Sequence, residues 1–442
     1  MGRLNAAGME LRMVFNFTLT GADTIKATLD SPDQAAQGIP LGRVRLSGDT
    51  IFVDATMLRG NYKGTFAGDS VIIGVWKQLG KEYPLDVRRQ KAPLAVLRPQ
   101  EPKPPFPYKT EDVTFRNSIE NFDLAGTLTM PEGPGPFPAV VLISGSGPQN
   151  RDETLLGHKP FLVLADHLTR NGIAVLRYDD RGVGKSKGNM IRATSMTLSE
   201  DAEAAATYLL SRPEIDKKMI GLAGHSEGGL IAPMVASRNS NIAFLVSLAG
   251  PGVSGYDIII RQTRDIQAAS GIPEKDIEET IRTNSKLFEM VMADSDQRKV
   301  AKDAMEWYNK ELDARGMDPE ERKTMMTQFT QALLSVNNPW FSYFLAVDPA
   351  EYWSKVKVPV LALNGDKDLQ VSAEMNLPAI KAALKKAKNK KVTIMALPGL
   401  NHLFQHCTTG APAEYATIEE TFSPEALQII TDWIKLTAKK RK

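Results

Sequence analysis

The sequence predicts an α/β protein: a doubly wound, mainly parallel sheet with a helical cap insertion, preceded by a small all-β domain. Three observations lead to this prediction. Apolar and polar residues alternate at period two in the first 90 residues. Short apolar runs alternate with helical patterns from residue 109, and charged helical periodicity interrupts them over 251–356. The expected parts are therefore 1–90, a Pro-rich linker over 91–108, and 109–442 with the cap at 251–356.

The first domain is expected to be a small antiparallel meander or partial barrel. Residues 10–20 alternate apolar and polar side chains over much of their length, which is typical of a half-buried strand. Turn signals such as Ser47-Gly48-Asp49 separate the shorter runs that follow. Further strands are expected over residues 25–29, 43–46, 51–53, 62–66, 71–76 and 83–87. Because the domain has no catalytic set of residues, we expect a structural accessory role, with carbohydrate or substrate binding left open.

The linker contains a run of prolines, which stiffens it into an extended spacer. After it we expect a hairpin over residues 111–116 and 123–130, and then strands that alternate with helices. The strands are expected over residues 139–143, 173–177, 220–223, 244–248, 358–363 and 391–397, and the helices over 162–170 and 199–211. Cap helices are expected over residues 256–270, 275–293, 296–315 and 319–334. Ligands of such an open sheet bind outside the carboxyl ends of its strands.

One stretch, Gly224-His225-Ser226-Glu227-Gly228, stands between an apolar run and a helical pattern of small residues. This G-x-S-x-G arrangement is typical of a nucleophile elbow, a strained strand-to-helix turn that exposes a serine hydroxyl. Both glycines are needed because a Cβ there would collide with neighbouring backbone. Ser226 becomes a strong candidate nucleophile only if an acid and a base follow along the chain. His225 is expected to be a packed or pocket-edge residue.

A carboxylate and a histidine do follow, each after an expected strand. The turn after the strand expected over 358–363 contains Asp366 and Asp368. The loop after the strand expected over 391–397 contains His402. Histidine can take the serine proton near neutral pH, and a carboxylate on its second nitrogen fixes its tautomer. His402 is favoured over His406 because it lies directly in the loop after the strand. The predicted triad is therefore Ser226, His402 and an aspartate of this turn.

An oxyanion hole needs two N–H donors. One is expected to be the N–H of Glu227, the residue after the nucleophile. The second is expected from the small-residue turn after the strand at 139–143, with Ser146 as the donor and Gly147 as the alternative.

A group of aromatic residues near the end of the cap is a candidate pocket wall. These residues are Trp340, Phe341 and Tyr343. Ordinary packing of the cap would place aromatic residues there equally well, because a cap core and a pocket lining can be the same surface. Both interpretations stay open.

These motifs resemble the α/β-hydrolase superfamily from about residue 108 to the C-terminus. The narrower likeness rests on residues 143–152, residues 176–186 and the elbow. They look like a group of bacterial serine esterases, loosely described as peptidase-like, with a small N-terminal β domain and commonly an export signal. The resemblance implies a carboxylester hydrolase without cofactor or metal.

Two loop assignments draw on this resemblance. The family pattern G-x-x-D-x-x-V begins at Gly365, which favours Asp368 over Asp366 as the acid. The resemblance also places Asp180 and Arg181 near the floor of the site, where we expect them to form a buried ion pair.

Composition and spacing exclude several other classes. The 54 basic and 52 acidic residues give a net charge of +2, so no broad attraction to nucleic acid or to an anionic membrane is expected. Residues 179–186 lack the first glycine of a phosphate-binding loop, and no His or Cys spacing is typical of a metal site. The single cysteine, Cys407, allows no internal disulfide. No stretch approaches the ~20 apolar residues of a membrane span.

The sequence therefore predicts a serine carboxylester hydrolase that acts on small to medium esters through an acyl-enzyme. A serine peptidase of the aminopeptidase type is the alternative, and it would need cap carboxylates such as the doublet Glu278-Glu279 to hold a free amine. A non-catalytic envelope- or polysaccharide-binding protein is a further alternative, which an intact triad disfavours. The N-terminus shows no signal peptide, so from the resemblance we expect an exported protein without its signal, with a cytoplasmic location left open.

Overall fold

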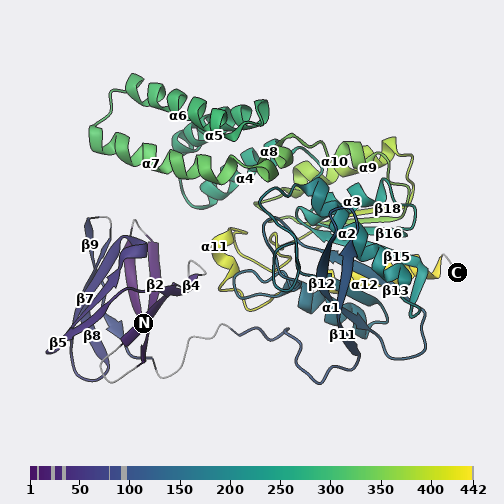
Figure 1. Ribbon diagram of the computed structural model, residues 1–442, viewed down its shortest axis with the longest axis horizontal. Coiled ribbons are helices and arrows are strands. Elements are labelled where there is room, and N and C mark those ends of the chain that lie inside the picture. Colours follow the sequence, from purple (N-terminus) through teal and green to yellow (C-terminus); the bar gives the residue numbers. More distant parts are fainter. Residues whose placement is uncertain (7–8, 21–24, 32–35, 79, 91–96, 441–442) are drawn as a thin grey trace. The chain divides into compact units, whose positions relative to one another are not determined.

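The chain folds into two compact units (Figure 1). The first contains Met1–Pro99, Leu155–His158 and Pro412–Glu419, and the second contains Gln100–Thr154, Lys159–Ala411 and Glu420–Lys442. The computed structural model describes residues 1–6, 9–20, 25–31, 36–78, 80–90 and 97–440. Part of the expected linker, residues 91–96, lies outside the described residues.

The first unit contains two antiparallel sheets that share an apolar core. One sheet has the strand order β1-β2-β3-β4, and the other has the order β10-β8-β7-β6-β5 with β9 paired to β8. Trp76, Tyr62 and Leu29 are almost completely buried in this core. The elements are β1 (Gly2–Ala6), β2 (Met9–Leu19), β3 (Ile25–Ser31), β4 (Ala36–Pro40), β5 (Val44–Ser47), β6 (Thr50–Ala55), the 3₁₀ turn η2 (Thr56–Leu58), β7 (Gly60–Phe66), β8 (Val71–Gln78), β9 (Lys81–Pro84), β10 (Val87–Arg88) and α11 (Pro412–Tyr415). The expected antiparallel β domain is confirmed.

The structure contains strands that the pattern of the first unit did not predict. β1 and β4 have only 5 residues each, which is too short for a clear alternation. The single strand expected over 83–87 divides into β9 and β10. The division falls at Leu85, whose side chain is buried and whose N–H bonds to Gly74 O at 2.8 Å.

The second unit is built on an eight-stranded sheet with the order β11-β12-β14-β13-β15-β16-β17-β18. β12 is antiparallel to both of its neighbours, and the strands from β14 to β18 run parallel. The strands are β11 (Lys109–Asn117), β12 (Phe122–Met130), β13 (Phe137–Ile143), β14 (Ala174–Tyr178), β15 (Ile215–His225), β16 (Phe244–Leu248), β17 (Val360–Gly365) and β18 (Val392–Leu397). β15 is longer than expected because its first residue, Ile215, pairs with Phe137.

Helices cover both faces of this sheet (Figure 1). The helices α2, α3 and α10 pack on one face with Leu222 and Ala362, and α1 and α12 pack on the other with Val140 and Phe244. Their bounds are α1 (Pro160–Arg170), α2 (Ser195–Ser211), α3 (Gly228–Ala236), α10 (Ala373–Lys386) and α12 (Pro424–Lys439). The doubly wound, mainly parallel architecture predicted from the sequence is confirmed.

A helical cap follows β16 and precedes β17. Its helices are α4 (Gly255–Ala269), α5 (Glu274–Ala293), α6 (Gln297–Ala314), α7 (Pro319–Val336), α8 (Pro339–Ala346) and the short α9 (Ala350–Trp353). The cap has its own core, in which Tyr308 stacks on Phe329 with ring centroids 4.0 Å apart. The aromatic segment forms α8 because the Asn338 side chain accepts from Phe341 N at 2.9 Å and Pro339 stands in the first turn.

Candidate active site

The elbow is a sharp turn between β15 and α3. β15 ends at His225, α3 begins at Gly228, and Ser226 between them has a φ of 52°. A left-handed backbone costs a residue with a Cβ about 1–2 kcal/mol. The turn is held by a hydrogen bond of 2.8 Å from Ser226 N to Leu248 O at the end of β16. Ser226 therefore stands in a strained turn at the carboxyl ends of the parallel strands.

The glycines of the elbow have no room for a side chain. An ideal Cβ on Gly224 would lie 1.9 Å from Gly228 O, and one on Gly228 would lie 2.1 Å from Ile143 O. Both neighbours are main-chain atoms, which cannot rotate away. Close backbone approach therefore requires glycine at both positions.

Replacing Gly228 with alanine is expected to lower the free energy of unfolding by about 3 kcal/mol or more, because α3 and the end of β13 must move apart. Urea unfolding measures this loss. Gly271 provides the control: its φ is +74°, but a Cβ there would meet nothing within 4 Å. Gly271→Ala should lose only the backbone strain of about 1–2 kcal/mol. Equal losses in the two variants would show that the close contact does not explain the glycine.

The structure brings Asp368 and His402 together. Asp368 follows β17 and His402 follows β18, and His402 Nδ1 lies 2.8 Å from Asp368 Oδ2. The second carboxylate oxygen, Oδ1, accepts from the N–H groups of Gln370 and Val371, both at 2.8 Å. The Asp368 side chain is completely buried. The carboxylate is therefore fixed by the turn that carries it, and it faces the histidine.

The two alternative residues of the sequence lie on the surface. Asp366 is exposed and accepts from Gly399 N at 2.7 Å. His406 is exposed and pairs with Glu420, with 2.9 Å between Nδ1 and Oε1. Within the part of the chain that the structure describes, the side chain of neither residue forms a hydrogen bond or ion pair with Asp368 or His402.

The loop that carries His402 lies beside the elbow. His225 Nε2, one residue before the candidate nucleophile, lies 3.0 Å from the carbonyl oxygen of His402, and the two rings have centroids 4.8 Å apart. On the other side, a Cβ added to Gly145 would lie 3.2 Å from Ser226 Cβ. Three loops that follow parallel strands thus meet around Ser226.

The small-residue loop after β13 presents main-chain donors beside the elbow. Among the described residues, neither Ser146 N–H nor Glu227 N–H has a main-chain acceptor. Ser146 is exposed, and Gly147 adopts a φ of 88° that favours glycine. Gly145 N–H is already used, because it donates to Glu153 Oε1 at 2.7 Å. The geometry therefore leaves the expected pair of N–H groups available.

The Glu227 side chain connects the elbow to the cap. It is 1% exposed, and its Oε1 accepts from Ser195 Oγ at 2.6 Å and from Trp340 Nε1 at 2.8 Å. Burial raises the pKa of the Glu227 carboxyl, although hydrogen bonds from Ser195, Trp340 and Ser146 oppose this rise. Trp340, an aromatic residue of the cap, thus contacts the elbow directly.

The other two candidate pocket residues have different surroundings. Phe341 is buried in the cap core against Phe288, with ring centroids 5.5 Å apart. Tyr343 lies with Tyr352, with 3.3 Å between the hydroxyl oxygens, and packs near Leu230 of α3. Their contacts are those of packing residues.

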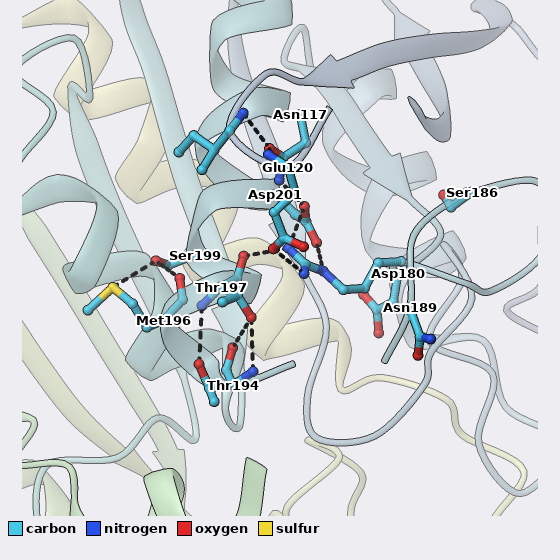
Figure 2. Close-up of polar contacts among 12 residues, drawn as sticks. Asn117, Glu120, Asp180, Ser186, Asn189, Thr194, Met196, Thr197, Ser199 and Asp201 are labelled. Carbon is cyan, nitrogen blue, oxygen red and sulfur yellow. Dashed lines mark hydrogen bonds and ion pairs between the residues drawn. The ribbon is translucent and has the colours of Figure 1, made fainter. Parts of the chain in front are cut away.

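The expected ion pair between Asp180 and Arg181 is wrong. Arg181 instead pairs with Asp201 of α2, with 2.7 Å between Nε and Oδ2, and with Glu120 at 2.5 Å (Figure 2). Asn117 donates to the same Asp201 at 2.6 Å. The carboxylates that pair with Arg181 are therefore those of Asp201 and Glu120 rather than that of its sequence neighbour.

Asp180 instead holds the small-residue loop after β13. Its carboxylate accepts from Ser144 Oγ at 2.9 Å and from Gln149 N at 2.8 Å. Asp180 lines a small cavity together with Asp201 and Tyr178. The cavity has a volume of about 10 Å³, which is enough for about one water. Burial raises the pKa of Asp180 from its ordinary value of 3.8 to about 8. At pH 7 this pKa favours the protonated form of Asp180.

This shift makes stability depend on pH. Between about pH 4 and about pH 8 the folded protein keeps a proton on Asp180 that the unfolded chain releases, so the contribution of Asp180 to stability falls as the pH rises through this window. Asp180→Asn removes this effect. As the pH rises, the free energy of unfolding of the variant should therefore gain about 1 kcal/mol per pH unit relative to that of the unsubstituted protein. Urea midpoints of both proteins across this range measure it. Parallel curves would contradict a neutral Asp180.

Several residues of the site have no signal in the sequence. Glu153 contacts His225 and Ser195 contacts Glu227. Asp201 contacts Arg181. No local spacing in the sequence identifies these contacts. Among the described residues, no group of three or more His, Cys, Asp or Glu could hold a metal. No helix of the described ranges has the length and apolar character that crossing a membrane requires.

Comparisons with known proteins agree with this arrangement. The sequence profile of a family described as serine aminopeptidase, S33, matches residues 159–406. Esterase EstD of Thermotoga maritima is 28% identical over 301 residues, 67% of this chain and 63% of EstD. Human acyl-coenzyme A thioesterase 1 is 34% identical over 138 residues, 30% of this chain and 29% of the thioesterase. The chain therefore spans less than two thirds of these relatives.

A solved structure gives a weaker match. The Pyrococcus furiosus esterase Pf2001 has 16% sequence identity and a TM-score of 0.44. The match covers 74% of this chain and 91% of that protein.

Proposed function

The chain belongs to the α/β-hydrolase family described as serine aminopeptidase, S33, and we propose that it is a serine carboxylester hydrolase acting on small to medium esters. The observation that carries this proposal is the buried bond of 2.8 Å between His402 and Asp368, beside the strained elbow of Ser226. The similarity to an esterase supports esters as the substrate class.

In the first step, Ser226 Oγ attacks the ester carbonyl carbon while His402 Nε2 takes the serine proton. Asp368 keeps the other ring proton on Nδ1, so that Nε2 is free to act as the base. The carboxylate also stabilises the imidazolium that forms. Two N–H groups of its own turn hold Asp368 in place at 2.8 Å.

Negative charge then develops on the carbonyl oxygen of the ester. The N–H groups of Glu227 and Ser146 would receive it, and the N-terminus of α3 adds a partial positive charge. Loss of one such donor typically costs on the order of 10²–10³ in turnover. These donors are fixed before the substrate binds, so they need no rearrangement during the reaction.

His402 next gives its proton to the leaving alcohol, and the acyl group remains on Ser226. Water, activated by the same histidine, attacks this acyl-enzyme and releases the carboxylic acid. The proton returns to Ser226. The cycle uses only groups of the chain and one water.

The aminopeptidase alternative requires a carboxylate that is free to bind a substrate amine. The candidate doublet is engaged elsewhere: Glu278 pairs with Arg264, and Glu279 pairs with Arg315. These arginines would have to be displaced before either carboxylate could bind an amine. The cap contacts therefore favour esters over peptides with a free amino group.

Three substrates, an ester, an anilide and a thioester, test the proposed function. We expect kcat/KM for p-nitrophenyl butyrate to exceed kcat/KM for alanine p-nitroanilide by a wide margin. Turnover of the anilide above that of the ester would replace the proposal with the peptidase. Butyryl-coenzyme A is the third substrate, and a preference for it would assign thioester hydrolysis instead.

A further inference from the structure

A second histidine–carboxylate pair lies directly beside the candidate triad. His225 Nδ1 lies 2.9 Å from Glu153 Oε1, and the two side chains are 8% and 4% exposed. His225 is the last residue of β15, and Glu153 belongs to the loop after β13. The proposed reaction assigns no proton transfer to either residue. The pair therefore needs a separate explanation.

Glu153 connects the pair to the segment of Gly145 and Ser146 in the loop after β13, which supplies a proposed oxyanion donor and is called the oxyanion loop below. The same Oε1 that faces His225 also accepts from Gly145 N–H at 2.7 Å. Glu153 has a φ of 51°, a left-handed backbone that costs a residue with a Cβ about 1–2 kcal/mol. Such strain persists only where the surrounding structure holds it, and it is concentrated at functional sites. The loop thus contains a strained residue whose carboxylate contacts the elbow at His225.

His225 connects the pair to the candidate base. Its Nε2 lies 3.0 Å from the carbonyl oxygen of His402. A continuous series of contacts therefore runs from Gly145 through Glu153 and His225 to His402. It joins the oxyanion loop, the elbow and the loop of the base, which come from three separate strands.

The acceptors around His225 determine its protons. A main-chain carbonyl can only accept, so Nε2 must carry a hydrogen. Glu153 Oε1 already receives the Gly145 N–H, and its partner oxygen Oε2 has no hydrogen-bond partner in the described part of the chain. Oε1 lies 2.9 Å from Nδ1 and acts as an acceptor toward Gly145, so a hydrogen on Nδ1 gives this oxygen a second donor. Both ring nitrogens then donate, and His225 is an imidazolium.

The charged groups around the ring agree with this state. Burial lowers the pKa of His225, but the charge of Glu153, its hydrogen bond, the His402 carbonyl and the charge of Asp368 raise it, and the net pKa is raised. The titratable groups that face the ring are Glu153, His402 and Asp368.

We propose that Glu153 and doubly protonated His225 form a positioning pair that keeps His402 and the oxyanion loop in place around Ser226. This inference rests on the proposed ester hydrolysis. The pair touches no reacting atom, and it acts through the main chain of His402 and Gly145. Its removal should disturb the transition state while leaving the surface that binds the ester unchanged.

Glu153→Gln is the direct test. Glutamine keeps the size and the acceptor oxygen of the side chain but loses its charge, so His225 becomes neutral and has one N–H. That N–H can serve either the side-chain oxygen of residue 153 or the carbonyl oxygen of His402, so one of the two hydrogen bonds is lost. We expect kcat for p-nitrophenyl butyrate to fall by about 10–10² fold. KM should stay nearly unchanged, because the lost interaction acts in the transition state. Circular dichroism and urea unfolding establish that the variant is folded.

The surface pair of His406 and Glu420 supplies the matched control. It has the same separation of 2.9 Å, with the histidine side chain 53% exposed. Glu420→Gln should therefore leave both kcat and KM at the values of the unsubstituted protein. If Glu153→Gln retains kcat as Glu420→Gln does, the positioning role is overturned.

A spectroscopic measurement covers the case in which Glu153→Gln does not fold. In the ¹⁵N NMR spectrum of the unsubstituted chain at neutral pH, both ring nitrogens of His225 should have the shifts of protonated nitrogens. A neutral single tautomer would overturn the proposal. The result does not depend on turnover, so the pair can be tested even if the protein hydrolyses no ester. Absence of ester hydrolysis would overturn the proposed function separately.

Discussion

A fall of about 10⁶ fold in kcat for p-nitrophenyl butyrate is expected when Ser226 is replaced by alanine, because the base then has no hydroxyl to activate. The fold should survive. The φ of 52° at this position is equally strained for serine and alanine, and the hydrogen bond from its N–H to Leu248 O does not use the side chain. The residual rate measures what the oxyanion donors and substrate binding contribute alone.

Two readouts separate loss of the nucleophile from general damage. A fluorophosphonate probe should label the unsubstituted chain and fail to label Ser226→Ala. Ser240, an exposed serine after α3, is the control residue, and Ser240→Ala should retain both labelling and turnover. Ester hydrolysis that persists in Ser226→Ala would remove the triad assignment.

Asp368→Asn is expected to lower kcat by about 10⁴ fold, because an amide presents the wrong partner to the histidine. The amide oxygen would turn to the N–H groups of Gln370 and Val371, which donate to Oδ1 at 2.8 Å. The NH₂ group would then face His402 Nδ1. It would hold the imidazole in the tautomer with its hydrogen on Nε2, where the base must be free.

The neighbouring aspartate provides the control for this substitution. Asp366 is exposed and accepts from Gly399 N at 2.7 Å, away from the histidine. Asp366→Asn should keep kcat unchanged. The reverse result, with Asp366→Asn inactive and Asp368→Asn active, would transfer the acid role to the other aspartate. Steady-state kinetics of the two variants on p-nitrophenyl butyrate decide between them.

Local patterns predicted the main architecture well. Buried parallel strands are continuous apolar runs, and the charged amphipathic helices of the cap have a clear period, so β16 and the helices α4 to α7 lie almost where the sequence places them. The elbow was predictable because the required glycines are two residues from the serine. β1, β4 and the division between β9 and β10 were not, because such short strands are defined by the strands they pair with.

Contacts between distant segments limited the prediction of the site. Arg181 pairs with Asp201 of α2 rather than with its neighbour Asp180, and this depends on which way the loop after β14 turns. Glu153 reaches His225 through a loop whose sequence shows no sign of that contact. The residues that follow strands could be placed at one edge of the sheet, but their hydrogen-bond partners required the structure.

The central claim is that the reaction passes through an acyl group on Ser226. The protein is mixed with excess p-nitrophenyl butyrate, quenched in acid during turnover, digested and analysed by mass spectrometry. A butyryl group should be found on the peptide that contains Gly224-His225-Ser226, and more of it should accumulate where deacylation is slow. Rapid hydrolysis with no butyryl group on this peptide, or with the group on another residue, would contradict the account.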